Sequence, residues 1–196
     1  MRTRSALALA AITLIAACSC TTTGTTFNPA DQATTIILIR HAERFNNPDP
    51  IADTQTPLNT EGLARAQTLN DVLSENGVDA IYCTDLLRNR QTVAPLAETL
   101  GLTPNLINPA LYVNINAAAQ TVVDQILTDH PGEVVLFCGN RGSVAGTRGI
   151  TDSIYRQLGG TGASPDRYQD MYIAVVPPDG DAHFIKTIYG PESSLD

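Results

Sequence analysis

Apolar residues in this chain gather into short runs that alternate with longer stretches of helical spacing. Five of the runs have the length and the polar or turn-forming borders that are typical of buried strands. We expect strands at Thr35–Arg40, Ala80–Cys83, Val134–Cys138, Met171–Val176 and His183–Tyr189. A turn signal at Pro177–Gly180 indicates that the last two strands form an antiparallel hairpin.

Helical spacing lies between the predicted strands, over Glu61–Glu75, Leu86–Leu100, Ala117–Thr128 and Thr151–Leu158. The apolar face predicted for the first helix consists of Leu63, Ala66, Leu69, Val72 and Leu73. Its N-cap is Asn59 or Thr60, and Gly77 is its stop signal; Pro95 either kinks the second helix or marks its true start. Strand–helix alternation followed by a hairpin predicts an α/β fold, a three-layer α/β/α sandwich with a mostly parallel central sheet.

The first residues have the pattern of an export signal. Basic Met1–Arg4 precedes an apolar stretch, Ser5–Ala17, that is too short for a permanent bilayer span. Leu14–Cys18 resembles a bacterial lipobox, which implies cleavage before Cys18, a lipid on its sulfur, and a lipid-anchored protein of the bacterial cell envelope, on the outer membrane or the periplasmic face. An ordinary secretory signal cut near Cys20 and an unprocessed anchor remain alternatives. We therefore expect a lipoprotein signal peptide at 1–17, a polar tether at 18–34 and one domain at 35–196.

Charge and cysteine content narrow the functional classes. The net charge of −8 argues against nucleic acid or an acidic membrane surface as the main partner, so any membrane contact is through the N-terminal lipid and any anion site is a local basic pocket. Cys83 and Cys138 are either bonded to each other or are two buried free thiols. No C-x-x-C pair or His/Cys cluster suggests zinc, and we expect neither a metal nor a cofactor.

Polar and reactive residues follow three of the predicted strands. These residues are Arg40 and His41 after the first strand, Arg88 after the second, and Asn140 and Arg141 after the third. Since the carboxyl ends of parallel strands meet at one edge of a sheet, these side chains could share a pocket. Guanidiniums around one imidazole would hold a phosphate beside a nucleophile. Taken singly, the Arg-His pair also fits a polar strand cap, and Arg88 fits a solvated helix face.

Three motifs together make the chain resemble the histidine phosphatase superfamily, which is also called phosphoglycerate mutase-like. They are LIRHAE at Leu38–Glu43, PLNTEG at Pro57–Gly62 and IYCTDLLRNRQT at Ile81–Thr92. With the closing Ile188–Gly190, they look most similar to the small single-domain branch that includes phosphohistidine phosphatases. The resemblance implies that His41 attacks phosphorus and becomes a phosphohistidine, which water hydrolyses, while Arg40 and Arg88 hold the phosphoryl oxygens. One ring nitrogen of His41 should then donate to a backbone carbonyl.

The chain departs from the family pattern at two points. The family has a second histidine in a Gly-His pair after the third strand, where this chain has Gly139-Asn140. Losing one preorganised donor typically costs about 10²–10³ in rate. We consider Asn140 and Arg141 as replacements; His130 precedes the third strand, at the opposite edge of the sheet, and His183 begins the final strand.

The general acid is the second departure, because residues 103–120 contain no Asp or Glu. Glu43, which is also a predicted substrate contact, and two further carboxylates, Asp49 and Asp53, lie near or after the nucleophile and are alternatives for this role. The expected function is phosphohydrolysis of a phosphorylated small molecule or phosphoprotein through His41, at a rate that the missing histidine would reduce. The alternatives are a catalytically silent phosphate-binding pseudoenzyme and an envelope scaffold.

Overall fold

The computed structural model describes residues 28, 31–46, 52–141 and 148–193. Its strands are β1 (Thr34–Arg40), β2 (Ala80–Thr84), β3 (Asn105–Ile107), β4 (Val134–Gly139), β5 (Asp170–Val176) and β6 (His183–Ile188). Its α-helices are α1 (Thr60–Leu73), α2 (Leu87–Leu100), α3 (Ile115–Asp129) and α4 (Ile150–Gln157). Two 3₁₀ helices, η2 (Ala52–Gln55) and η3 (Pro109–Asn114), complete the described elements. The predicted signal peptide and most of the predicted tether, with Cys18, lie outside the described residues.

The strands form one six-stranded sheet in the order β3-β2-β4-β1-β5-β6. β1, β2, β3 and β4 pair in parallel, so their carboxyl ends share one edge. β5 runs antiparallel to β1, with Ile39 opposite Met171, and β6 runs antiparallel to β5. The predicted hairpin and the mostly parallel sheet are therefore confirmed, and the reversal of β5 brings its first residues to the edge where β1 ends.

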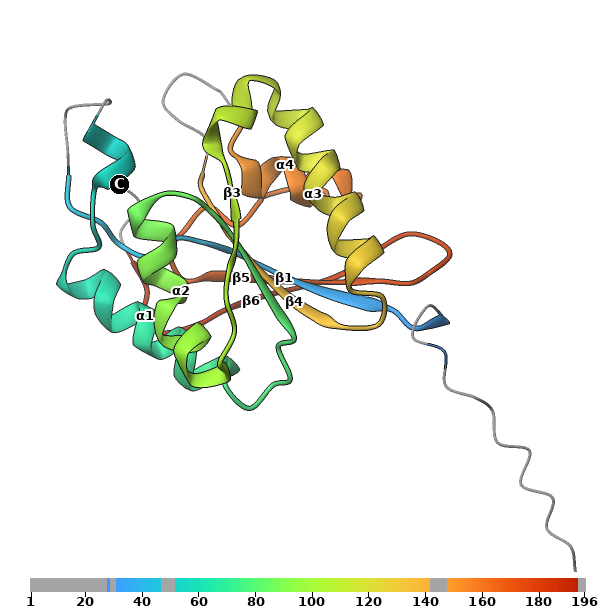
Figure 1. Cartoon of the computed structure of the whole chain (residues 1–196), viewed down its shortest axis with the longest axis horizontal. Helices are drawn as coiled ribbons and strands as arrows, with labels where there is room; N and C mark the ends of the chain where they lie inside the picture. Colours follow the sequence, from blue (N-terminus) through green and yellow to red (C-terminus); the bar gives the residue numbers. More distant parts are fainter. Residues whose placement is uncertain (1–27, 29–30, 47–51, 142–147, 194–196) are drawn as a thin grey trace, which may run out of the picture.

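Helices cover both faces of the sheet, which confirms the three-layer α/β/α architecture (Figure 1). On one face, Leu69 of α1 and Leu96 of α2 pack with Ile37, Ile39 and other buried strand residues. On the other face, α3 and α4 pack against the alternate strand positions, which include Ile36 and Leu38. Successive residues of β1 thus point alternately to the two cores, as expected for a strand that is buried on both faces. Within the described residues, no helix is both long enough and apolar enough to cross a membrane.

The buried face of α1 differs from the predicted one. Leu63 and Val72 are 55% and 40% exposed, whereas the side chain of Arg65 is buried. The helix also ends at Leu73, two residues earlier than predicted, while its N-cap is Asn59, whose side chain accepts from the Gly62 amide. The buried face of α1 therefore includes Gly62 and Arg65, and leaves out Leu63 and Val72.

Two further details were missed or left open by the apolar pattern. The edge strand β3 has only three residues, two of them exposed, which is too short to give a periodic signal. Helix α2 continues through Pro95 to Leu100 and ends at Gly101, which has a left-handed backbone with φ 67°. Pro95 is therefore inside the helix and does not mark its start.

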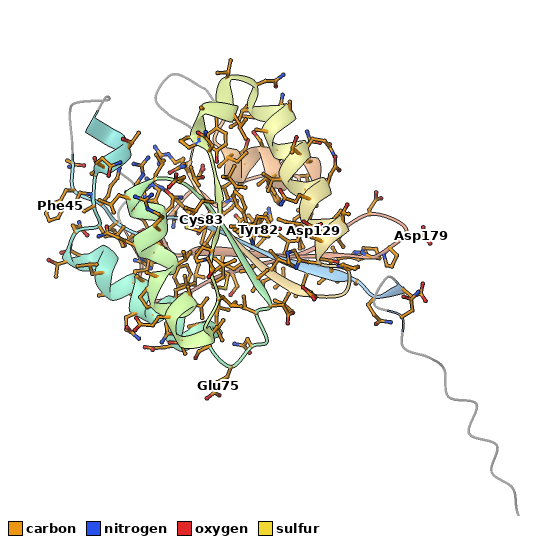
Figure 2. The ribbon with its side chains drawn as sticks, viewed as in Figure 1. Phe45, Glu75, Tyr82, Cys83, Asp129 and Asp179 are labelled. Atoms are coloured by element: carbon orange, nitrogen blue, oxygen red, sulfur yellow. The ribbon has the colours of Figure 1, made fainter. Side chains whose placement is uncertain are left out.

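Cys83 and Cys138 lie directly opposite each other on the parallel strands β2 and β4. Both are free thiols buried between the helical layers, with Cys83 at the centre of the molecule (Figure 2). Burial raises the pKa of the Cys83 thiol to about 12 and that of Cys138 well above its ordinary value. Of the two alternatives from the sequence, the structure has the pair of buried thiols.

Candidate active site

The carboxyl ends of β1, β2 and β4 bring three predicted site residues to one edge of the sheet. Arg40 ends β1 opposite Gly139 of β4, and the His41 amide donates to the Gly139 carbonyl at 3.0 Å. Arg88 lies in the first turn of α2, just after β2. All three of Arg40, His41 and Arg88 are buried. The sheet topology thus gathers the imidazole and two guanidiniums as the strand-end pattern predicts.

The His41 ring is fixed by its own backbone neighbour. Its Nδ1 lies 2.7 Å from the Ala42 carbonyl oxygen, and only 3% of the residue is exposed. A carbonyl oxygen can only accept, so Nδ1 carries the proton and Nε2 carries the lone pair. This is the tautomer that attack on phosphorus through Nε2 requires.

The electrostatic surroundings keep this imidazole neutral. Burial lowers the pKa of His41 well below its ordinary value, and the positive charges of Arg40 and Arg88 lower it further. The hydrogen bond to Ala42 opposes these effects, and Arg44 adds a smaller lowering. A neutral imidazole among cationic side chains has its lone pair at neutral pH and lies in a field that attracts an anionic substrate.

Arg40 is held by a segment that comes before β5. Its Nη1 donates to the Asp166 carbonyl and its Nη2 to the Tyr168 hydroxyl, both at 3.0 Å. The guanidinium carbon lies 3.8 Å from the centroid of the Tyr168 ring, and the ring centroids of Tyr168 and His41 are 5.7 Å apart. Tyr168 was not among the predicted site residues. Only its aromatic character within a polar stretch distinguishes it in the sequence.

The LLRNRQT segment positions the site through three residues of one helix. While Arg88 reaches the site, the Thr92 hydroxyl accepts from the Ala42 amide at 2.9 Å and donates to the Arg88 carbonyl. The Gln91 side-chain oxygen accepts from the Leu58 amide at 2.8 Å. The Arg-x-x-Gln-Thr spacing therefore joins the loop that begins at His41 and the PLNTEG segment to α2.

At Gly62, helix α1 comes extremely close to the loop that begins at His41. A Cβ added to Gly62 would lie 1.9 Å from the Glu43 carbonyl oxygen, so only glycine fits here. The same carbonyl accepts from the Asn59 amide at 3.0 Å. The Thr-Glu-Gly motif thus marks a point of backbone contact.

Glu43, which is predicted as a substrate contact or general acid, is paired with an arginine of α1, and its predicted role stays a prediction. Its carboxylate receives three hydrogen bonds from the Arg65 guanidinium at 2.6–3.0 Å, and the two side chains are 14% and 3% exposed. Arg65 also donates to the carbonyls of Tyr189 and Pro191, at 3.0 and 2.9 Å. Through these contacts, the buried Glu43–Arg65 pair joins the loop that begins at His41, α1 and the segment that follows β6.

The other predicted site residues have fewer defined contacts. Asn140 directly follows β4, and its buried side-chain oxygen has no hydrogen-bond partner in the described part of the chain. Arg141 is partly exposed next to it. Asp49 lies outside the described residues, and Asp53 falls in η2. The substrate roles of Asn140 and Arg141 stay predictions.

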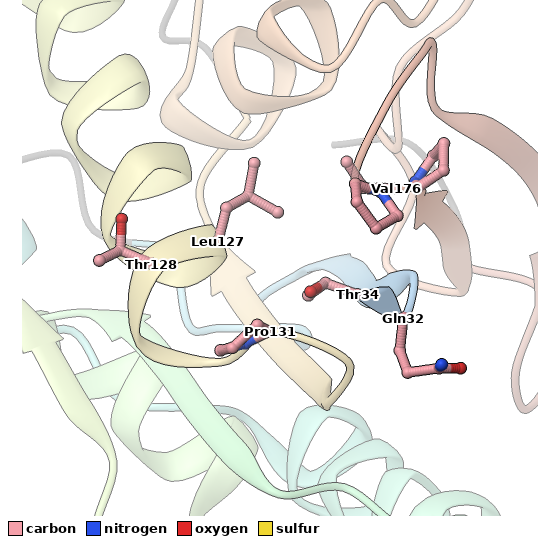
Figure 3. Close-up of a pocket in the computed structure, with 8 residues that line it drawn as sticks. Gln32, Thr34, Leu127, Thr128, Pro131 and Val176 are labelled. Carbon is pink, nitrogen blue, oxygen red and sulfur yellow. The ribbon is translucent and has the colours of Figure 1, made fainter. Parts of the chain in front are cut away.

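The opposite edge of the sheet carries different features. A cavity of about 360 Å³ opens where β1 begins and β5 ends, lined by Thr34, Leu127, Val176 and their neighbours (Figure 3). The Thr34 hydroxyl there donates to the His130 carbonyl at 3.0 Å, so His130 lies at this edge as predicted. This cavity is separated from His41 by the length of β1. Across the described ranges, no three His, Cys, Asp or Glu side chains gather as metal ligands would.

Comparison with known proteins supports the sequence motifs. Residues 36–112 match the model of the histidine phosphatase superfamily, branch 1. A curated relative, the PE-PGRS family protein PE_PGRS11 of Mycobacterium tuberculosis, is 34% identical over 80 residues, or 39% of this chain. The chain spans 14% of the length of that relative.

Solved structures share the fold at low sequence identity. The protein histidine phosphatase SixA complexed with tungstate has a TM-score of 0.58 at 16% identity, over 79% of this chain and 96% of that one. The mycobacterial glucosyl-3-phosphoglycerate phosphatase Rv2419c has a TM-score of 0.54 at 13% identity, over 81% and 99%. The matching family model over residues 36–112 and the three motifs support a relationship to the histidine phosphatase superfamily, and the solved structures share its α/β/α fold.

Proposed function

We propose that the protein is a phosphohydrolase that works through a phosphohistidine at His41. One observation carries the proposal: the Nδ1 contact with Ala42 leaves Nε2 as the nucleophilic nitrogen, beside two buried arginines. Burial and positive charge both favour the neutral ring that has this lone pair. The same charges attract the phosphoryl group to it.

In the first step, the Nε2 lone pair attacks phosphorus and a P–N bond forms. The bond from phosphorus to the leaving atom breaks, and the leaving group takes the electron pair and a proton from solvent. In the second step, water attacks phosphorus and gives up a proton to solvent, the P–N bond breaks with its electron pair returning to Nε2 of His41, and inorganic phosphate is released. Arg40 and Arg88 neutralise the phosphoryl oxygens in both steps.

The contacts of Glu43 narrow the class of substrate. Because this carboxylate is held by Arg65, it is poorly placed to protonate a leaving group. The leaving group of a phosphohistidine or an acyl phosphate needs little protonation, so we favour these substrates over alkyl phosphates. The molecule that carries the phosphoryl group is a phosphoprotein or a phosphorylated small molecule. Among the structures with this fold, SixA is a protein histidine phosphatase and Rv2419c is a glucosyl-3-phosphoglycerate phosphatase, so the fold occurs with both a protein and a small-molecule substrate. Asn140 or Arg141 would supply the additional donor.

Hydrolysis of p-nitrophenyl phosphate by the purified protein, from acidic to neutral pH, tests the proposal. His41→Ala removes the nucleophile, and His183→Ala is the matched control because it removes an exposed histidine of β6. We expect turnover in the wild type and in the control, and none above background in His41→Ala. Equal rates in all three proteins would contradict the proposal for this substrate.

A second function is favoured by the Asn140 position and by the paired state of Glu43. Both features weaken catalysis but leave the arginine clamp, so a catalytically silent phosphate-binding protein is the alternative to an enzyme. Titration with orthovanadate distinguishes the two. Micromolar binding without turnover on p-nitrophenyl phosphate or acetyl phosphate would favour the binding protein, whereas failure of Arg88→Ala to alter that binding would favour an envelope scaffold.

We also propose that the protein is anchored in the bacterial envelope through a lipid on Cys18. The support is the Leu14–Cys18 pattern and the polar stretch that follows it. Metabolic labelling with a clickable fatty acid tests this directly. Label in the wild type that disappears in Cys18→Ser but not in Cys20→Ser would support the proposal. A wild type that takes up no label, or a Cys18→Ser variant that keeps it, would contradict the proposal.

A further inference from the structure

The segment before β5 reaches the nucleophile because that strand runs antiparallel to β1. In the pairing of Ile39 with Met171, the start of β5 lies beside the end of β1. Residues 166–170 therefore lie beside Arg40 and His41, on the same edge of the sheet. In an all-parallel sheet, the residues before a strand would lie at the other edge.

Three contacts between this segment and Arg40 fix the guanidinium in one plane. They are the 3.0 Å bonds to the Asp166 carbonyl and the Tyr168 hydroxyl, and the stacking over the Tyr168 ring at 3.8 Å. The Tyr168 ring is buried and lies 5.7 Å from the imidazole of His41 at an angle of 55°. One side chain thus touches the arginine and neighbours the nucleophile.

Hydrogen bonds to Asp170, the last residue of the segment, stabilise its conformation. One carboxylate oxygen of Asp170 accepts from the amides of Asp166 and Arg167, at 3.0 and 2.9 Å. The Asp170 amide returns a bond to the Arg167 carbonyl at 3.2 Å. This closed turn holds the Asp166 carbonyl towards Arg40 and presents Tyr168 to the site.

We propose that Tyr168 is a positioning residue that holds Arg40 in the orientation needed to bind an oxyanion beside His41. The inference rests on the proposed phosphoryl chemistry at that site. An arginine held in its binding plane before the ligand arrives loses little freedom on binding, which strengthens the complex. Tyr168 acts on the ligand through Arg40, and Asp170 acts through the turn.

The first test compares Tyr168→Phe with the wild type. This variant keeps the ring and its stacking but removes the oxygen that accepts from Arg40. We expect the Kd for orthovanadate and for inorganic phosphate, and the KM for p-nitrophenyl phosphate, to rise about tenfold, as for loss of a hydrogen bond to a charged group. The kcat should change less than KM.

Tyr82→Phe is the matched control. Tyr82 is also buried, and its hydroxyl lies 3.1 Å from Nε2 of His130 at the opposite edge of the sheet. The two variants lose the same hydroxyl from equally buried rings. If their melting temperatures are similar and only Tyr168→Phe has a raised Kd for the anions, the effect is one of positioning and not of a general loss of structure. We expect Tyr82→Phe to bind both anions as the wild type does.

A second pair of variants tests the hydrogen bonds to Asp170 without altering the site. Asp170→Ala removes the acceptor for two amides and should weaken vanadate binding about threefold, as for a modest loss of hydrogen bonding. Asp170→Asn keeps an acceptor oxygen and should restore binding. If Tyr168→Phe does not fold, the two Asp170 variants still test whether this segment positions Arg40.

The outcomes separate this inference from the proposed function. Wild-type affinity in Tyr168→Phe and in Asp170→Ala would overturn the inference while leaving the proposed function intact. A fall in kcat with unchanged Kd values would also overturn it, because Tyr168 would then act in the chemical step. A wild type that neither binds vanadate nor turns over substrate would overturn the proposed function, and the inference with it.

Discussion

Two histidines lie at opposite edges of the same sheet, and their partners give them opposite properties. His41 has Nδ1 against a backbone carbonyl, while arginines lie near its ring. His130 has both nitrogens in side-chain contacts, Nδ1 at 2.7 Å from the Glu133 carboxylate and Nε2 at 3.1 Å from the Tyr82 hydroxyl. The first ring retains a nitrogen for attack, whereas the second is a structural link between α3 and β2. What an imidazole can do is decided by what its nitrogens already bind.

The largest contrast is expected between His41→Ala and His130→Ala. His41→Ala should lower kcat/KM by about 10⁴-fold or more, since no other group replaces the nucleophile. His130→Ala should retain turnover but lose about 1–3 kcal/mol of stability, because the buried Tyr82 hydroxyl loses its partner. Hydrolysis assays and urea unfolding of both variants check this. Equal loss of activity in the two proteins would remove the distinction between the edges.

The carboxylates at the two edges, Glu43 and Glu133, should contribute differently to the free energy of unfolding. Glu43→Ala leaves the buried Arg65 guanidinium without its pair and should cost about 3–5 kcal/mol. Glu133→Ala breaks a contact whose carboxylate side is 44% exposed and should cost less than about 1 kcal/mol. Urea unfolding of each variant measures the two costs. A small cost for Glu43→Ala, with weaker vanadate binding, would instead place Glu43 in the substrate site.

Two arginines on one helix sharpen the assignment of the anion site. Arg88 is buried near His41, whereas Arg90 is half-exposed and pairs with Asp85. Arg88→Ala should raise the Kd for vanadate about 10²-fold through the loss of charge-assisted hydrogen bonds. Arg90→Ala should leave it unchanged. Calorimetric titration of both variants is the measurement, and equal effects would show that net charge, rather than a defined site, attracts the anion.

The pH dependence gives the smallest effect. Because the pKa of His41 is lowered in the folded protein, the unfolded chain binds more protons in the range from about pH 6.5 down to the folded pKa. Stability should therefore fall as pH decreases through that range and level off below the folded pKa. The catalytic rate should persist below pH 6.5 for the same reason. NMR titration of His41 checks the direction, and a pKa above 6.5 would contradict the assigned surroundings.

The strand-end chemistry is readable in the sequence because an uninterrupted apolar run fixes where β1 stops. Arg40 and His41 follow this run directly, and parallel pairing then determines their neighbours. Arg65 and Tyr168 were missed for physical reasons. A charged residue in a helix normally faces solvent, so the buried Glu43 pair has no periodic signal. Tyr168 reaches the site only because β5 reverses direction, which local sequence does not specify.

Detection of the phosphoenzyme tests the central claim most directly. The protein is mixed with acetyl phosphate, quenched in alkali, in which phosphohistidine survives, and analysed by mass spectrometry and ³¹P NMR. We predict one phosphoryl group on Nε2 of His41, which is absent from His41→Ala and present in His183→Ala. Turnover of acetyl phosphate without phosphate on His41, or with phosphate on another residue, would contradict the account.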